Sequence, residues 1–164
     1  MPTFRNVHWL WLTALTMLLD QISKQLVVKN LAWADIVPLM PHLNLTHLHN
    51  TGAAFSMFSG SSPIVFVVIG VVVSVGILVW MRRNPHGQVL VAIALSLIMG
   101  GALGNVIDRV TRGHVVDFID FYWGTWHFAA FNVADSAISL GAGFMVLDVI
   151  LEAFRKKPAA SSGA

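Results

Sequence analysis

Four long apolar segments dominate the chain, and each has the length of a membrane-spanning helix. About 20 consecutive, mostly apolar residues are enough to cross a bilayer as a helix. The segments are residues 9–28, 63–81, 89–107 and 133–151. The second carries no charged side chain, and in the third only Asn105 is strongly polar. Because lipid offers no hydrogen-bond partner to an open backbone, we expect all four segments to be α-helices.

Two longer connections, residues 29–62 and 108–132, separate these segments and differ from them in pattern. Both mix polar, aromatic and turn-forming residues, and apolar and polar residues alternate over 43–46. Such alternation predicts a short β-strand. The chain has the length of one domain, so residues 1–164 are expected to form a single integral membrane domain.

The composition agrees with lipid surroundings. Hydrophobic residues make up 56% of the chain and charged residues 11%, against a charged share of about 25% in ordinary soluble domains. The mean hydropathy is +0.72. The chain has no cysteine, which excludes disulfides, thiol catalysis and a cysteine-based metal site.

The positions of the basic residues predict the orientation of the chain. Arg5 precedes the first apolar segment, residues 82–83 lie between the second and third, and residues 155–157 follow the fourth. With four spans these places share one side, which their excess of Lys and Arg marks as cytoplasmic. We therefore expect both termini inside and both long connections outside. The net charge of +2 then reflects topology, and no nucleic-acid partner is expected.

The first apolar segment contains two opposite charges. Asp20 and Lys24 stand four residues apart and share one face of a helix. An isolated charge at the bilayer centre costs about 2.5–3.5 kcal/mol on insertion scales. Either the two residues form an internal ion pair from which Lys24 reaches outward, or Asp20 faces the bundle and helps to order a site. The spacing leaves both interpretations open.

The third apolar segment ends in small and polar residues. Gly100 and Gly104 form a small-xxx-small pair, which lets another helix approach closely. Four residues follow at helical spacing on one side: Gly101, Asn105, Asp108 and Arg109. Such a polar stripe has no purpose in a purely structural bundle, so we expect it to face a functional site.

The stretch 113–135 places aspartates among aromatic residues at the membrane surface. Asp117 and Asp120 are three residues apart, on opposite faces of a strand but on one face of a helix. Periodicity does not choose between these two structures. Asp135 stands at the outer end of the fourth segment, one helical turn from Asn132, which can orient it.

Paired carboxylates of this kind can activate water. Two carboxyl groups held close together and partly out of water share a proton near neutral pH. The ionised member can take a proton from a water that attacks a carbonyl group, while the protonated member hydrogen-bonds the carbonyl oxygen. This chemistry requires no metal and no cofactor, and we expect neither.

Other interpretations of the polar residues remain open at this point. The acids could form a proton relay in a small carrier, or be structural groups in a lipid-binding module. His42, His47 and His49 lie in the first connection without a neighbouring acid, which argues against a metal site. In the same connection residues 50–55, NTGAAF, contain Gly and Ala that leave the backbone accessible to an extended peptide.

Five motifs, in this order, resemble those of the lipoprotein signal peptidase (signal peptidase II) family. They are Asp20-x-x-x-Lys24, NTGAAF over 50–55, GGALGNVIDR over 100–109, VVDF over 115–118 and FNVADS over 131–136. The chain length, the four predicted spans and the predicted orientation also agree with that family.

The resemblance implies an aspartic endopeptidase of the bacterial inner (cytoplasmic) membrane. Its substrates would be prolipoproteins, cleaved before the diacylglyceryl-modified cysteine to release the signal peptide. The implied partners also include membrane phospholipid and cyclic peptide inhibitors of the globomycin type. The implied fold is a membrane all-α protein: a four-transmembrane-helix bundle with a small β-rich extracytoplasmic cradle and a membrane-surface helix. The active site would lie near the outer membrane–water interface.

The resemblance also assigns roles to individual residues. By motif, Asp117 and Asp135 are the catalytic pair, which selects Asp117 over Asp120. Other matching positions are implied to bind substrate or to support the pair: Asp20, Lys24, Asn50, Gly52, Gly101, Gly104, Asn105, Asp108, Arg109, Asn132 and Ala134.

Overall fold

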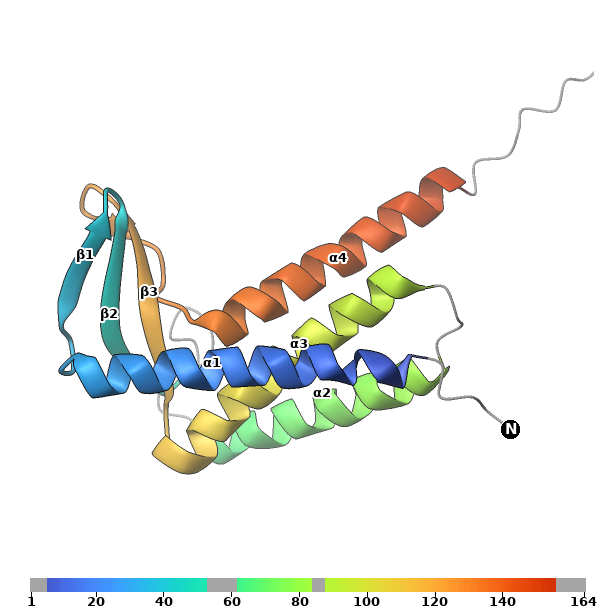
Figure 1. Cartoon of the computed structure of the whole chain (residues 1–164), viewed down its shortest axis with the longest axis horizontal. Coiled ribbons are helices and arrows are strands. Elements are labelled where there is room, and N and C mark those ends of the chain that lie inside the picture. Colours follow the sequence, from blue (N-terminus) through green and yellow to red (C-terminus); the bar gives the residue numbers. More distant parts are fainter. Residues whose placement is uncertain (1–5, 53–61, 84–87, 156–164) are drawn as a thin grey trace, which may run out of the picture.

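The structure is a computed structural model that describes residues 6–52, 62–83 and 88–155. Within these ranges the chain forms four long α-helices and a small antiparallel sheet. The helices are α1 (Leu10–Asn30, after the short 3-10 helix η1, Val7–Trp9), α2 (Pro63–Arg83), α3 (Val89–Arg112) and α4 (Val133–Arg155). They run alternately toward and away from the sheet, which lies at one end of the bundle (Figure 1).

Three of these helices, α2, α3 and α4, are long and apolar enough to cross a membrane. Many large apolar side chains of α2 and α4 are exposed on the outside of the bundle, as contact with lipid requires. α1 is as long as α2 but carries Asp20 and Lys24. Among the described helices, it is not one of those apolar enough to be candidate membrane spans. The predicted helices are therefore present, α2, α3 and α4 are candidate membrane helices, and the crossing of α1 stays a prediction.

The central helix is α3, which packs against each of the other three. A Cβ atom at Gly100 would lie 2.7 Å from Cβ of Thr16, and one at Gly104 would lie 2.6 Å from Oδ2 of Asp20. Both neighbours belong to α1, so the close approach predicted for this glycine pair is confirmed. Toward the end of the bundle away from the sheet, α2 and α3 share an apolar core formed by Ile77, Met81, Val91, Leu95 and Met99.

α3 extends beyond Ile107, where the predicted apolar segment ended. It continues to Arg112, so Asp108 and Arg109 lie on the helix. Gly113 ends it with a φ of 77°, a left-handed conformation that glycine adopts without a steric penalty.

The sheet has the strand order β1-β2-β3-β4. Its strands are β1 (Ile36–Met40), β2 (Leu43–Asn50), β3 (Val115–Trp123) and β4 (Trp126–His127). β2 confirms the strand predicted from alternation. Because β3 is a strand, Asp117 and Asp120 lie on its opposite faces.

Two sets of contacts fix the sheet to the bundle. Val27 at the end of α1 packs with Val116 and Phe118 of β3 in a buried cluster. The chain then returns from β4 along β3, where Phe131 O accepts hydrogen bonds from the backbone of Phe118 (3.0 Å) and Ile119 (2.8 Å). This return segment brings the start of α4 beside the strand that carries Asp117.

The described parts of the two long connections contain no helix besides the ends of the four named above. The membrane-surface helix that the family resemblance implies is therefore not among the observed elements. Residues 53–61, which include the second half of the NTGAAF motif, lie outside the described ranges.

Replacing Gly101 by alanine is expected to separate α3 from α4. The added Cβ would overlap the carbonyl oxygen of Ala134, a backbone atom that cannot rotate away. Overpacking of this kind typically costs about 1–3 kcal/mol, so Gly101→Ala should lower the midpoint of thermal unfolding in detergent by several degrees. A Cβ at Gly143 on α4 would meet nothing within 4 Å, so Gly143→Ala is the matched control. Equal midpoints for the two variants would contradict this packing.

Candidate active site

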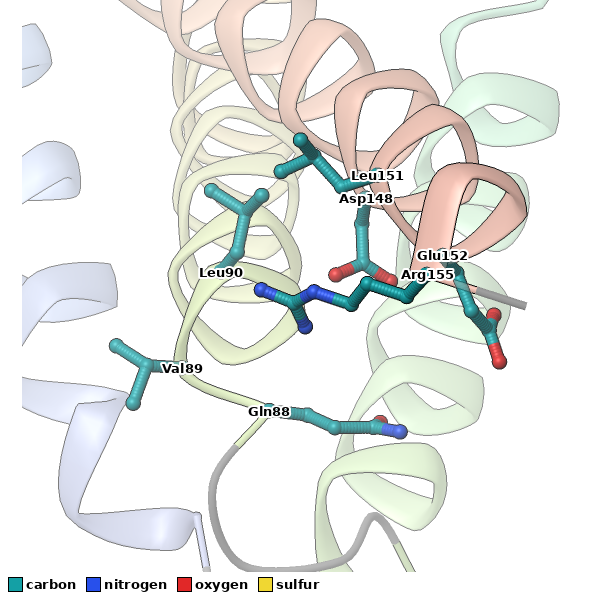
Figure 2. A pocket seen from close by; sticks show the side chains of 7 residues that line it. All are labelled: Gln88, Val89, Leu90, Asp148, Leu151, Glu152 and Arg155. Carbon is teal, nitrogen blue, oxygen red and sulfur yellow. The ribbon is translucent and has the colours of Figure 1, made fainter. Parts of the chain in front are cut away.

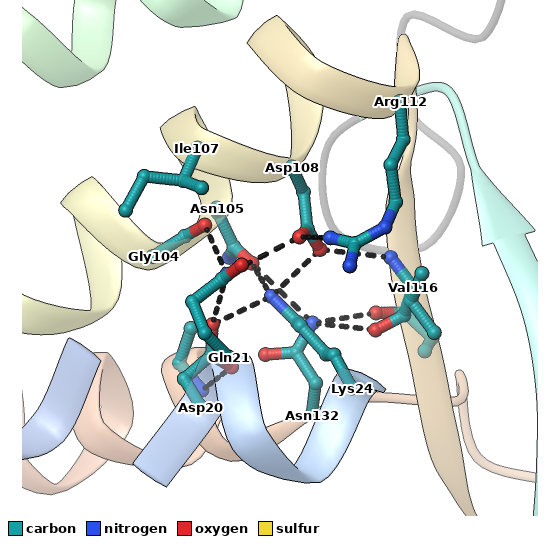
Figure 3. Close-up of polar contacts among 12 residues, drawn as sticks. Asp20, Gln21, Lys24, Gly104, Asn105, Ile107, Asp108, Arg112, Val116 and Asn132 are labelled. Carbon is teal, nitrogen blue, oxygen red and sulfur yellow. Dashed lines mark hydrogen bonds and ion pairs between the residues drawn. The ribbon is translucent and has the colours of Figure 1, made fainter. Parts of the chain in front are cut away.

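Lys24 lies at the centre of a buried polar cluster between α1, α3 and the start of α4 (Figure 3). Its Nζ is 2.8 Å from Oδ2 of Asp20, 2.9 Å from Oδ2 of Asp108 and 2.8 Å from Oδ1 of Asn105. The side chains of Lys24 and of both acids are 0% exposed. Asp20 and Lys24 thus form an ion pair, but Lys24 does not reach outward as that interpretation expected. The pair faces the interior of the bundle, with Asp108 as a second anionic partner.

Gln21 and Arg112 complete this cluster. Neither was among the site residues predicted from the sequence. Gln21 Nε2 donates to Oδ2 of Asp20 and to Oδ1 of Asp108, both at 3.2 Å. Arg112 pairs with Asp108 from the next turn of α3. The four-residue spacing of Asp108 and Arg112 was a signal for this pair. Two anions and two cations therefore share the cluster, as buried charges require.

The two acids of the cluster also hold two backbone N–H groups from other segments. Asp20 Oδ1 accepts a hydrogen bond from the backbone of Ala134 at 2.9 Å. Asp108 Oδ2 accepts one from the backbone of Val116 at 3.1 Å. Each of these N–H groups belongs to the residue immediately before one of the two predicted catalytic aspartates.

Asn132 connects the two predicted catalytic aspartates. Its Nδ2 donates to Oδ1 of Asp117 at 2.7 Å. Its Oδ1 accepts from the backbone of Asp135 at 3.0 Å, while its own N–H donates to Oδ2 of Asp135 at 3.2 Å. This reciprocal pair is a capping box at the start of α4. The structure places Asn132 against Asp135, as the spacing predicted, and against Asp117 as well.

Asp117 is buried, with 3% of its surface exposed. Besides Asn132 it has one further donor, Nδ2 of Asn50 on β2, at 3.0 Å from Oδ2. Burial is the main cause that raises the pKa of Asp117 to about 7, and the nearby charge of Asp135 raises it further. The two asparagine hydrogen bonds and the charge of Lys24 act in the opposite direction.

Asp120, the alternative on the same strand, has different partners. It accepts hydrogen bonds from Nδ2 of Asn44 at 2.9 Å and from Nδ1 of His127 at 2.8 Å. The structure therefore brings Asp117, and not Asp120, together with Asn132 at the start of α4.

The polar stripe on α3 faces the acids and the end of β2. Asn105 Nδ2 donates to Oδ1 of Asp135 at 2.8 Å. Arg109 Nη2 donates to the carbonyl oxygen of Gly52 at 2.6 Å. The N–H of Gly52 in turn donates to Oδ1 of Asn50 at 2.9 Å. The same stripe includes Gly101, which provides space for α4 rather than a polar group, and Gly104 of the glycine pair provides space for α1.

A cavity of about 790 Å³ opens beside these residues. Its polar wall consists of Asn50, Asn105, Arg109 and Asp135, while Asp117 lies behind Asn50 and is not part of the wall. The remaining wall is mostly apolar and aromatic, and contains Phe66, Val115, Phe128, Ala129, Ala130, Phe131, Ser136, Ile138, Ser139 and Leu140. The cavity can therefore accept a ligand with a large apolar part and a polar group facing Asp135.

A smaller cavity of about 350 Å³ lies between the start of α3 and the end of α4 (Figure 2). Its wall contains Gln88, Val89, Leu90, Asp148, Leu151, Glu152 and Arg155. None of the predicted site residues belongs to this wall, so the cavity at the sheet end is the candidate active site.

The histidines of the first connection have structural contacts. His42 and His47 each place Nδ1 within hydrogen-bond distance of a backbone carbonyl oxygen. The ring of His49 stacks on that of His114, with 3.7 Å between the ring centres. Among the described residues no group of three His, Asp or Glu side chains is placed to hold a metal ion, and we assign no metal ligands.

Comparison with known proteins gives the family. The family described as Signal peptidase (SPase) II matches residues 12–151. A lipoprotein signal peptidase of Escherichia coli O157:H7 is 47% identical over 155 residues, which cover 93% of this chain and 94% of that protein. One from Pasteurella multocida is 48% identical over 146 residues, or 87% and 88% of the two chains.

Solved structures agree with the sequence comparison. A bacterial membrane enzyme determined by the in meso method superposes with a TM-score of 0.85 at 29% identity, covering 94% of each chain. A second structure with the same description gives a TM-score of 0.77 at 30% identity, over 87% of this chain and 92% of the other. The chain is therefore a membrane protease that belongs to the signal peptidase II family.

Proposed function

We propose that this protein removes signal peptides from prolipoproteins and that Asp117 and Asp135 activate the attacking water. The relatives are named lipoprotein signal peptidase, which supports this substrate class. The observation that carries the assignment of the acids is Asn132, whose side chain hydrogen-bonds both of them. Asn105 adds a donor to Asp135, and Asn50 adds one to Asp117.

The two acids differ in a way that suits general acid–base catalysis. Asp117 is deeply buried and holds a proton near neutral pH. Asp135 faces the cavity and receives two hydrogen bonds, from Asn105 and from the N–H of Asn132. In the proposed reaction ionised Asp135 takes a proton from water as the water oxygen attacks the scissile carbonyl carbon. Protonated Asp117, which Asn50 separates from the cavity in this structure, donates a hydrogen bond to the carbonyl oxygen once Asn50 moves aside. The proton on Asp135 then moves to the leaving amine as the C–N bond breaks.

The cavity suits a substrate with lipid and apolar peptide parts. Its aromatic and aliphatic wall matches the acyl chains of a diacylglyceryl-modified cysteine and the apolar residues of a signal peptide. Arg109 holds Gly52 beside the polar wall, where the peptide bond would lie. Cyclic peptides of the globomycin type would occupy the same cavity as inhibitors. Phospholipid would surround the apolar outer faces of the helices.

The proposed setting is the bacterial inner membrane, with four spans including α1. The alternating course of the helices places the start of α1 and the ends of α2 and α4 away from the sheet (Figure 1). Arg82, Arg83 and Arg155 lie at those ends, which supports a cytoplasmic location for both termini. The sheet and the acids would then lie on the outer side, near the membrane–water interface, and the implied membrane-surface helix would cover the cavity from that side.

Asp117→Asn and Asp135→Asn should each lower kcat for a diacylglyceryl-modified prolipoprotein at least about a thousandfold. Each change removes one proton-transfer group while preserving the size of the side chain. Asp120→Asn is the matched control on the same strand, since Asp120 contacts Asn44 and His127 rather than the site. Purified variants would be compared in detergent by the rate of signal-peptide release. Near-normal cleavage by either of the first two variants would exclude the proposed pair.

The rate of cleavage should fall as the pH rises through about 7. The pKa of Asp117 is raised to about 7, so its proton is present below that pH and is lost above it. Asn50→Ala removes a hydrogen bond that lowers this pKa, and should move the alkaline limb of the pH–rate profile to higher pH. Asn44→Ala, which removes the equivalent donor to Asp120, should leave the limb in place. An alkaline limb that does not respond to Asn50→Ala would contradict the role of Asp117.

Single cysteines can test the proposed orientation because the chain has none of its own. Thr125 is exposed in the turn between β3 and β4, and Gln88 is exposed at the opposite end of α3. A membrane-impermeant maleimide should label Thr125→Cys in intact spheroplasts, and should label Gln88→Cys only after lysis. The reverse pattern would overturn the orientation.

A further inference from the structure

Asn105 is the residue through which the buried cluster reaches the cavity. Its Nδ2 donates to Asp135 and its Oδ1 accepts from Lys24, each at 2.8 Å. An asparagine side chain has an acceptor on one side and two donors on the other, so its neighbours determine which side faces where. An ammonium group can only donate, and it therefore requires the oxygen of Asn105 on its own side.

We propose that Lys24 is a positioning residue, which fixes the amide of Asn105 so that its nitrogen faces Asp135. This inference rests on the proposed function of Asp135 as the group that takes a proton from water. Without the ammonium, the amide could turn and place its oxygen against the carboxylate, where two acceptors repel each other. Asp135 would then lose one of the two hydrogen-bond donors to its carboxylate.

The position of Lys24 supports an indirect role. Its side chain is 0% exposed, and its ammonium group faces Asp20, Asn105 and Asp108 instead of the cavity, so Lys24 is not placed to contact a substrate. Asp20 and Asp108 hold the ammonium from two sides and restrict its movement. Among the residues that the structure describes, one other donor lies near Oδ1 of Asn105, Nδ2 of Asn132 at the longer distance of 3.4 Å. Because that group already donates to Asp117 at 2.7 Å, it is a weak substitute.

The same ammonium connects the two backbone anchors described above. Asp20 holds the N–H before Asp135, Asp108 holds the N–H before Asp117, and Lys24 bridges the two carboxylates. Loss of the bridge would therefore relax the spacing of the acids as well as the orientation of Asn105. Both changes act on the polar end of the cavity, where the chemical step takes place, and neither alters its larger apolar wall.

The test is the double variant Asp20→Asn/Lys24→Met. It removes one positive and one negative charge, so that no unbalanced buried charge remains. The new asparagine at position 20 still offers an oxygen to the backbone of Ala134. We expect kcat for a diacylglyceryl-modified prolipoprotein to fall about ten- to a hundredfold, with KM within about threefold of wild type.

Thr13→Val is the matched control. Thr13 lies on α1 two helical turns before Asp20, and its hydroxyl donates a buried hydrogen bond to the carbonyl oxygen of Ser96 on α3 at 3.0 Å. This variant should keep kcat within about threefold of wild type, because it weakens the contact between the same two helices without freeing the amide of Asn105. A double variant that is folded by circular dichroism and keeps kcat within about threefold of wild type, like Thr13→Val, would overturn the proposal.

If the double variant does not fold, Asn105→Asp tests the same proposal. This change keeps an acceptor for Lys24 but removes the donor to Asp135 at neutral pH. A folded Asn105→Asp enzyme with the wild-type pH profile would overturn the proposal, whereas a lower kcat that partly recovers at acidic pH would support it. Failure of the proposed function is a separate result, since it requires that Asp117→Asn or Asp135→Asn remain active in the same assay.

Discussion

A lysine ammonium buried between two carboxylates is the interaction on which the rest of the site depends. Removing an ion from water costs several kcal/mol unless it is paired and hydrogen-bonded, so Lys24, Asp20 and Asp108 can only be buried together. That requirement sets the position of α1 against α3 to within a hydrogen-bond length. The same two acids also accept backbone hydrogen bonds. Asp20 accepts one from the N–H of Ala134, and Asp108 accepts one from the N–H of Val116. The ion pairs inside the bundle thereby fix the positions of the two backbone segments that carry Asp135 and Asp117.

Small residues make that arrangement possible. The carboxylate of Asp20 occupies the space that a side chain at position 104 would fill, and the first turn of α4 occupies the corresponding space at Gly101. Between helices in lipid, close backbone contact of this kind is a main source of attraction, because apolar side chains gain little from leaving an apolar solvent. The glycines are therefore as much a part of the polar cluster as the charged groups, since any larger residue would push the partners apart.

Much of this architecture could be predicted from local sequence features. Segment length and apolarity predicted the helices, and the four-residue spacing predicted the pair of Asp20 and Lys24. The spacing of Asn132 and Asp135 predicted their contact, because both belong to one helical turn. Contacts between distant segments could not be predicted in this way. Lys24 and Asn105 are 81 residues apart, and only the fold brings them together. The choice between Asp117 and Asp120 required either the family resemblance or the structure, since a short stretch rich in aromatics suits a strand and a helix equally well.

The hydrogen bond between Asp20 and the backbone of Ala134 joins the first helix to the last across 114 residues of sequence. A chain that still lacks α4 has Asp117 but neither Asp135 nor Asn132, and its Asp20 has no N–H group to accept from at that position. No partial product of synthesis can therefore assemble the pair of acids. Under the proposed function, the enzyme would therefore become active only after its last helix has joined its first.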